Sequence, residues 1–452
     1  MFSYNLQLAL KSLKERPALT ILTILAIATG LGLYTTVKTM SYQSSQVPLA
    51  HKSKNIFLLQ MDNREITADA VEHQSRMVDT TYKDTLNLMQ LEMPGVKQTF
   101  NWSTYGILNV EDENINPLRT FAAVTSSAFF TMFEPPFLYG NGWDKATEES
   151  GEAVIVISKL MNDKLFGGRN SVGESVRINT HVLKIIGVLD TWHLTHKFYD
   201  RSFSRARPDN FFIPYTFAME NNLPRRAGFD CWAANADISR SFRTENTARL
   251  INSECAWVTF WAEVPEAKIT DYRQQIMSYM GSEKTLGRFP RKLEMYLTNL
   301  NDQLTYIHGR NQFLKTFSVL ATLFFAVCLL NAVGILLAKF MRRKKEVSLR
   351  RALGAKKKTI IMQHLLEVII IGLLGGALGV VISYFGLQGM MNIRLYSSDY
   401  TVRVEDVMPY FQLNWIMIAN AFVTGIMCTI VASIYPIWRL CNIPPASQLK
   451  SQ

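Results

Sequence analysis

Residues 339–358 read KFMRRKKEVSLRRALGAKKK and carry ten Lys and Arg side chains against a single acidic one, Glu346. An apolar stretch of more than twenty residues flanks this segment on either side. Short loops rich in Lys and Arg stay on the cytoplasmic side of a bilayer, so the segment predicts membrane topology. A cationic run can also bind nucleic acid, but the flanking apolar segments favour the topological interpretation, and we expect no nucleic-acid partner.

The net charge of +11 is concentrated in short segments. Residues 41–312 hold 29 Lys and Arg against 31 Asp and Glu, which gives this long segment a net charge of −2. The composition therefore indicates a nearly neutral soluble domain and a short, dense cationic loop. It does not indicate one continuous basic surface.

Four apolar segments are each long enough to cross a bilayer as a helix, which takes ~20 residues. The first uncharged run, between Arg16 and Lys38, spans 21 residues. A secretory signal peptide has a shorter apolar core of roughly 7–15 residues and a small-residue cleavage site after it. No clear site follows this run, so we expect a retained helix. The third segment is rich in Gly, which lets neighbouring helices approach closely.

Positive charge gathers at both ends of the chain and between the second and third apolar segments. The positive-inside rule therefore places both termini in the cytoplasm. The predicted fold class is a membrane α-helical protein with four transmembrane helices and a large α+β extracytoplasmic domain inserted between helices 1 and 2. The predicted segments are a cytoplasmic amphipathic helix at 1–16, transmembrane helices at 17–40, 313–338, 363–392 and 414–438, an extracytoplasmic domain with a helical stalk at 41–312, a cytoplasmic loop at 339–362, a short outer loop at 393–413 and a cytoplasmic tail at 439–452.

The large domain shows strand and helix patterns in alternation. Residues 153–157 form an apolar run typical of a buried strand, Ser158 is a candidate helix N-cap, and Gly167 is a candidate helix end. Residues 196–228 are rich in Arg and aromatic side chains and predict a long loop or insertion. The other predicted elements are a strand at 55–59, a helix at 82–92, hairpin strands at 175–178 and 182–189, and a helix at 301–313 that runs into the second membrane helix.

Five cysteines are too few for a disulfide-rich scaffold. Cys231 and Cys255 both lie in the large domain. A disulfide between them is permitted if that domain lies outside the cytoplasm. The sequence does not give the distance between the two residues, which decides whether the bond can form.

The cationic loop also carries a recognisable motif. Residues 346–355 read EVSLRRALGA, which resembles the E-I-G-x-R-R-A-L-G-A loop after the second span of MacB/FtsX-type ABC transporter permeases. Ser348 stands where that family has Gly. YPIWR at 435–439 and PPASQLK at 444–450 resemble the family's C-terminal ending, and VTSSAFF at 124–130 resembles part of its periplasmic core domain.

The resemblance implies a mechanotransmission permease of the bacterial inner membrane with a periplasmic domain. Such a subunit pairs with a second, identical or homologous permease subunit and binds an ABC ATPase, which holds the ATP and Mg. A periplasmic adaptor and an outer-membrane channel are further partners in export systems. The ATPase-coupling residues that the resemblance implies are Glu346, Leu349, Arg350, Arg351, Ala352, Leu353 and Gly354. The alternative role of this loop is to bind membrane lipid, at about 1 kcal/mol per positive charge.

Signals of catalysis are weak in this sequence. It contains no G-x-x-x-x-G-K-[ST] phosphate loop, so we expect a non-catalytic chain that itself binds no cofactor or metal. His364 and Glu367, one helical turn apart, are a candidate metal or proton site, although polar anchoring at the membrane interface is the favoured interpretation. Three functions stay open: an export permease, a regulatory permease that activates an outer enzyme such as a cell-wall hydrolase, and a membrane-anchored enzyme.

Overall fold

The computed structural model describes residues 2–15, 17–64, 79–110, 115–192, 194, 197–200, 209–226, 231, 247–309, 312–396, 404 and 408–442. The chain forms two compact units. The first, here called the helical unit, comprises residues 1–45 and 309–452, and the second, the sheet unit, comprises residues 46–308. In chain order the sheet unit therefore lies between the first and second long helices.

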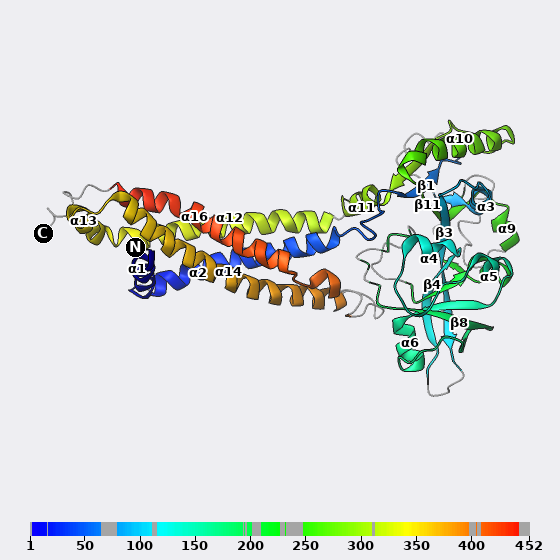
Figure 1. The fold of residues 1–452 in the computed structure, drawn as a ribbon, viewed down its shortest axis with the longest axis horizontal. Helices are drawn as coiled ribbons and strands as arrows, with labels where there is room; N and C mark the ends of the chain where they lie inside the picture. The colour runs from blue at the N-terminus through cyan, green and yellow to red at the C-terminus, as the bar shows by residue number, and fades with distance from the viewer. Residues whose placement is uncertain are drawn as a thin grey trace. The chain divides into compact units, whose positions relative to one another are not determined.

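Four long helices make up most of the helical unit (Figure 1), and all four are long and apolar enough to cross a membrane. They are α2 (Pro17–Ser44), α12 (Gln312–Met341), α14 (Lys357–Tyr396) and α16 (Trp415–Cys441). α2 and α16 each pack against both α12 and α14, so the four helices form a closed bundle. α14 extends beyond the predicted span 363–392 at both ends, because its helical pattern continues into the polar residues on either side.

Shorter helices complete the helical unit. They are α1 (Phe2–Glu15), α13 (Lys344–Ala352) and the 3₁₀ turn η4 (Met408–Phe411). α1 contacts α14 and α2, while α13 contacts α16. α1 and α13 lie at the same end of the bundle in Figure 1. The segment 339–362, predicted as a loop, therefore holds one short helix and parts of two long ones.

Glycine residues let the long helices approach closely. A Cβ atom at Gly372 of α14 would lie 2.5 Å from Oγ1 of Thr429 in α16, and one at Gly32 of α2 would lie 2.6 Å from a methyl carbon of Ile382 in α14. Side chains of any size would separate these helices. The Gly-rich pattern of the third apolar segment thus has the packing role that it predicts.

Within the described residues, the sheet unit is built on a 12-stranded sheet whose main path runs β12-β1-β11-β3-β4-β9-β6-β8-β5. β4 pairs with β9 and β6 with β8 in parallel, and the other pairs are antiparallel. The strands are β1 (Ile56–Met61), β2 (Thr80–Thr81), β3 (Lys97–Asn109), β4 (Leu118–Thr125), β5 (Phe137–Gly140), β6 (Val154–Ser158), β7 (Ser175–Ile178), β8 (His181–Leu189), β9 (Phe211–Pro214), β10 (Arg225–Arg226), β11 (Ala256–Glu263) and β12 (Met295–Asn299).

Helices of the sheet unit are mostly short. They are α3 (Tyr82–Met89), α4 (Ala128–Phe133), α5 (Lys145–Glu149), α6 (Lys159–Phe166), α7 (Tyr215–Glu220), α9 (Thr247–Ile251), α10 (Ile269–Thr285), α11 (Leu300–Gly309) and the 3₁₀ turn η3 (Glu266–Lys268). The Ser158 hydroxyl caps α6 by accepting from the Met161 N–H, and Gly167 ends the same helix at a positive φ of 64°. Both predicted ends of this helix are confirmed. The predicted hairpin is confirmed too, with Asn179 at φ 52° between β7 and β8.

The prediction that residues 196–228 form a long loop or insertion is wrong for their central part. Phe211–Pro214 is the buried strand β9, which pairs with β4 on one side and β6 on the other. This strand has only four residues, all apolar and all buried, so it shows no alternation that would separate it from the neighbouring Arg and aromatic residues. The Arg-rich residues 201–208 lie outside the described residues, and so do the tail residues 444–450.

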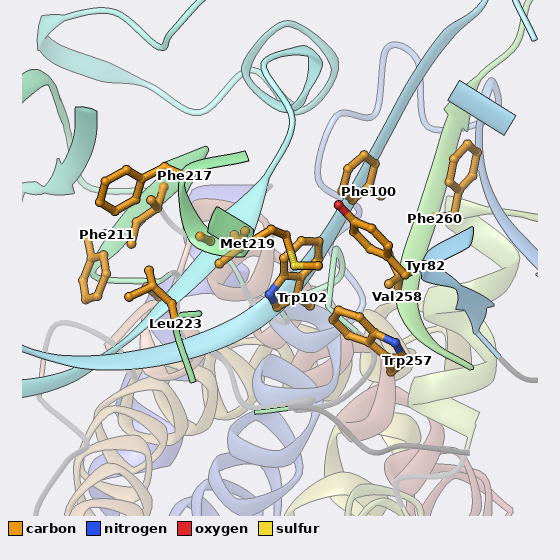
Figure 2. Close-up of a cluster of buried hydrophobic side chains, with 14 of the residues drawn as sticks. Tyr82, Phe100, Trp102, Phe211, Phe217, Met219, Leu223, Trp257, Val258 and Phe260 are labelled. Atoms are coloured by element: carbon orange, nitrogen blue, oxygen red, sulfur yellow. The ribbon is translucent and has the colours of Figure 1, made fainter. Parts of the chain in front are cut away.

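Alternating residues of the strands build one core on each face of the sheet. Along β1, Phe57 and Leu59 belong to the larger core, whereas Ile56 and Leu58 belong to the other. Figure 2 shows part of the larger core, where Trp102, Trp257 and Tyr82 meet. The ring centroids of Trp102 and Trp257 are 5.1 Å apart in an edge-to-face arrangement, and Tyr82 stacks on Trp257 at 6.0 Å. Aromatic packing of this kind adds to the stabilisation from burial.

A disulfide joins Cys231 to Cys255, the residue just before β11. Cys255 is fully buried beside the larger core. The bond that the sequence permitted is therefore present in the structure. Cys328, Cys428 and Cys441 are free and all lie in the helical unit.

Candidate functional site

α13 is anchored through one face only. Val347 and Ser348 are buried, with 6% and 3% of their surface exposed, and Val347 packs into a core that includes Phe340 and Leu440. On the other side of the helix Leu349 is 51% exposed. Leu353, the first residue after the helix, is 80% exposed. The burial of one face fixes the position of the helix and leaves apolar side chains in solvent.

Gly354 ends α13 in a backbone conformation that is strained for residues with a Cβ atom. Its φ is +96°, in the region that favours Gly. The Gly354 N–H donates to the Arg351 carbonyl at 3.1 Å, and the Ala355 N–H donates to the Arg350 carbonyl at 3.0 Å. These two bonds form a Schellman motif, which satisfies carbonyls left free at the helix end. No atom lies within 4 Å of where a Cβ of Gly354 would stand, so the position is open.

The two arginines of α13 have different partners. Arg351 donates through Nη1 to the main-chain oxygen of Cys441 at 2.8 Å, which ties α13 to the end of α16. Arg350 pairs with Glu346 at 2.6 Å along the exposed side and donates to Oε1 of Gln363 in α14 at 3.1 Å. Arg351 therefore holds the helix in place, whereas Arg350 and Glu346 present charge to the surroundings.

Six of the seven predicted coupling residues thus share one open surface, here called the coupling surface. Only Arg351 turns inward, to bond the end of α16. The coupling surface consists of Glu346, Leu349, Arg350, Ala352, Leu353 and Gly354. An apolar patch flanked by charged groups is a suitable docking element for a partner helix or groove.

A buried ionic cluster lies next to α13. Nζ of Lys339 in α12 is 2.6 Å from Oε1 of Glu367 in α14, and both side chains are fully buried. Lys339 also donates to Oγ1 of Thr20 in α2 at 2.9 Å. Nδ1 of His364 lies 3.4 Å from the other carboxylate oxygen of Glu367.

Arg343 extends this cluster to α1. Its Nη2 donates to the main-chain oxygen of Ser12 at 2.8 Å and to Oε2 of Glu15 at 2.9 Å, and its Nη1 bonds the Ser12 hydroxyl. Nη1 also lies 4.0 Å from Oε2 of Glu367. The buried ionic cluster is here defined as Ser12, Glu15, Thr20, Lys339, Arg343, His364 and Glu367.

Sequence reasoning identified His364 and Glu367 but treated Lys339 and Arg343 only as topological charges. No local feature of the sequence distinguishes these two cations from the other Lys and Arg residues of the cationic segment. Among the described residues no group of three or more His, Cys, Asp or Glu side chains is placed to hold a metal ion. Glu367 instead pairs with the cations Lys339 and Arg343, and His364 lies beside the same carboxylate.

Ionic groups in the sheet unit have structural partners. Nζ of Lys197 lies 2.8 Å from Asp200 and 2.8 Å from Asp209, all nearly fully buried. Burial alone would lower the pKa of Lys197, but the two carboxylates outweigh it and raise that pKa above its usual value. Arg288 pairs with Asp84 at 2.7 Å and with Glu254 at 2.7 Å, which ties α3 to the segment before β11.

Two protein-family models match the chain. An FtsX-like permease C-terminal domain matches residues 318–445. A MacB-like periplasmic core domain matches residues 20–242. Together the two matches include α13, most of the sheet unit, and the members Thr20, Lys339, Arg343, His364 and Glu367 of the buried ionic cluster.

Curated relatives of the chain are named as export proteins. "Macrolide export ATP-binding/permease protein MacB" of Bdellovibrio bacteriovorus is 22% identical over 373 residues, covering 81% of this chain and 51% of that protein. "Pyoverdine export ATP-binding/permease protein PvdT" of Pseudomonas entomophila is 22% identical over 329 residues, covering 72% of this chain and 42% of that protein. The chain thus spans about half the length of the curated relatives it matches.

Solved structures that the chain matches include the periplasmic region of MacB from Actinobacillus actinomycetemcomitans, with a TM-score of 0.35 and 12% identity over 59% of this chain and 95% of that one. The extracellular domain of the ABC-type transporter YknZ from Gram-positive bacteria gives a TM-score of 0.32 and 13% identity over 54% of this chain and all of that one.

Proposed function

The chain belongs to the permeases that combine a MacB-like periplasmic core domain with an FtsX-like C-terminal domain, a family of ABC export systems, and we propose that it couples ATP hydrolysis by a separate ABC ATPase to movement of its sheet unit. In this proposal the chain itself binds no ATP or Mg. It lies in the bacterial inner membrane with both termini in the cytoplasm and the sheet unit in the periplasm.

The observation that carries this proposal is that the coupling surface is exposed while the opposite face of α13 is buried against the bundle. Leu353 is 80% exposed, yet the same helix is fixed by buried Val347 and by the bond from Arg351 to Cys441. Attraction to anionic lipid headgroups accounts for the positive charge of this segment but not for an apolar patch held in a defined geometry beside it. A docking element needs both, because apolar side chains supply contact area and charged groups fix the orientation.

The coupling surface transmits force through the elements that hold it. The partner ATPase supplies the energy of ATP hydrolysis. Arg351 connects α13 to α16, and Arg350 connects it to α14 through Gln363. A displacement of α13 therefore reaches two membrane helices directly. We further propose that the chain works as a pair with a second permease subunit, and that a periplasmic adaptor and an outer-membrane channel complete the export path.

The decisive experiment places a carboxylate in the coupling surface. Leu353→Glu adds a charge to the proposed apolar contact, while Thr359→Glu adds the same charge at an exposed position in the first turn of α14, outside that surface. We expect Leu353→Glu to abolish co-purification of the ABC ATPase from native membranes, so that the purified sample no longer hydrolyses ATP, and Thr359→Glu to retain both. Retention of the ATPase and of hydrolysis by Leu353→Glu would contradict the proposal.

A further inference from the structure

The buried ionic cluster is centred on the junction between α12 and α13. Lys339 lies in the last turn of α12, and Arg343 is the residue immediately before α13. Both side chains point into the protein, with none of Lys339 and 7% of Arg343 exposed. The cluster is thus in a position to control the angle at which α13 leaves the bundle.

The cluster joins this junction to three other helices. Arg343 contacts Ser12 and Glu15 of α1. Lys339 contacts Thr20 of α2 and Glu367 of α14. Phe340, between the two cations, packs its ring against His364 of α14 with centroids 4.7 Å apart. A tilt of α13 about the end of α12 would have to break several of these contacts together.

Stability alone is a weak reason for such a cluster. The cost of taking two charges out of solvent offsets most of their attraction, and apolar pairs of similar volume are often equally stable. Buried ions do impose geometry, because a small displacement leaves a charge without a partner in a medium of low dielectric constant. An ion pair therefore resists sliding and bending more selectively than an apolar contact does.

We propose that Lys339, Arg343 and Glu367 are positioning residues that lock the α12–α13 junction to α1, α2 and α14. With the junction locked, a force on the coupling surface moves the membrane helices. Without these contacts, the same force bends the junction and does not move the membrane helices. This inference rests on the proposed function, but the stiffness of the junction is a property of the chain alone.

The test replaces the central ion pair without leaving a lone charge. Lys339→Met/Glu367→Met removes both charges at similar side-chain volume, so we expect the chain to insert and fold normally. Glu367→Asp keeps the carboxylate and is the conservative variant. Lys145→Met/Glu149→Met removes an exposed Lys–Glu pair of the sheet unit, with side chains 73% and 65% exposed, and is the matched control.

Junction stiffness is measured with spin labels at Lys345 of α13 and Met362 of α14, both exposed, in a chain with its free cysteines replaced. Measurements use the chain alone in lipid nanodiscs, and then its complex with the ATPase trapped by ATP and vanadate. We expect a narrow label-to-label distance distribution in the native chain, in Glu367→Asp and in the matched control. The Met/Met variant should give a broad distribution and hydrolyse ATP with loss of ATP-driven movement of the sheet unit.

The outcomes separate the two proposals. A narrow distribution in the Met/Met variant would overturn the junction lock, whether or not an ATPase binds the chain. The native chain could fail to bind any ATPase while the Met/Met variant gives a broad label-to-label distance distribution. That result would support the junction lock and refute the proposed function. A Met/Met variant with a broad label-to-label distance distribution and undiminished ATP-driven movement of the sheet unit would refute the mechanical role of the lock.

Discussion

Lys339 and Glu367, on two different membrane helices, meet with 2.6 Å between Nζ and Oε1 while both are fully buried. An isolated charge inside an apolar bundle is costly, so each residue makes the other tolerable. Lys339 lies five residues before α13, the helix that carries the coupling surface. This arrangement leads to predictions for the helical unit, and two other features lead to predictions for the sheet unit.

Removing one member of the ion pair should be far more damaging than removing both. Glu367→Ala leaves the Lys339 ammonium buried and unpaired, which typically costs about 3–5 kcal/mol. The double variant Lys339→Met/Glu367→Met should cost much less. Thermal unfolding of the purified chain in detergent checks this difference. Equal destabilisation by the single and double variants would show that the two charges do not depend on each other.

Gly354→Ala should loosen the end of α13, because a residue with a Cβ is strained at φ +96° by about 1–2 kcal/mol. We expect weaker binding of the ATPase, measured by titration of the purified components. Gly334→Ala is the matched control. Gly334 lies within α12 and likewise has no atom near its Cβ position, but its φ is not positive. Equal binding by both variants would rule out the Schellman turn as a determinant of the coupling surface.

Glu148 should make the stability of the sheet unit depend on pH. Burial raises its pKa to about 7, although Oε2 accepts hydrogen bonds from the Ser127 N–H and from Nε1 of Trp143. The folded state therefore holds the proton more tightly than the unfolded state. This contribution to stability is complete below the unfolded value of about 4.5 and is lost as the pH rises to about 7.

Glu148→Gln keeps the shape and an acceptor oxygen but does not titrate. We expect the native chain to lose ~2–3 kcal/mol more stability than Glu148→Gln between pH 4.5 and pH 7.5, since each pKa unit corresponds to ~1.4 kcal/mol. Thermal midpoints of both proteins at the two pH values give the comparison. Parallel pH profiles for the two proteins would contradict the raised pKa.

Cys231→Ser should destabilise the sheet unit. The bond to Cys255 closes a loop with a sequence separation of 24, and a loop of this size corresponds to ~3 kcal/mol in the chain-entropy model. Peptide mapping of the native protein without reductant should find Cys231 linked to Cys255 and only Cys328, Cys428 and Cys441 free. A lower thermal midpoint of Cys231→Ser, reproduced by reducing the native protein, completes the test. Quantitative alkylation of Cys231 in the unreduced native protein would contradict the bond.

The sequence predicted features with strong local causes. The four apolar segments are fixed by length and hydropathy, and α6 is bounded by Ser158 and Gly167 through capping chemistry that acts within a few residues. The exposed face of α13 followed from a motif resemblance. β9 was missed because four residues carry too little periodicity, and its assignment depends on pairing with β4 and β6, which lie far apart in sequence.

The partners of the buried ionic cluster were also beyond the sequence. Glu367 is conspicuous as an acid in an apolar run, but three cations lie near it along the chain, and many more lie in the cationic segment. Only the tertiary contacts with Thr20 of α2, with Ser12 and Glu15 of α1 and with Glu367 of α14 select Lys339 and Arg343 from them. Tertiary contacts over more than 300 residues, such as Arg343 with Ser12, leave no local signal.

The central claim is that the sheet unit and the coupling surface lie on opposite sides of a membrane. Single cysteines at Lys145 in α5 and at Lys345 in α13, both exposed, test it in a chain with its free cysteines replaced. A membrane-impermeant maleimide applied to spheroplasts should label Lys145→Cys at once and Lys345→Cys only after permeabilisation. Labelling of both positions from the same side of the intact membrane would contradict the account.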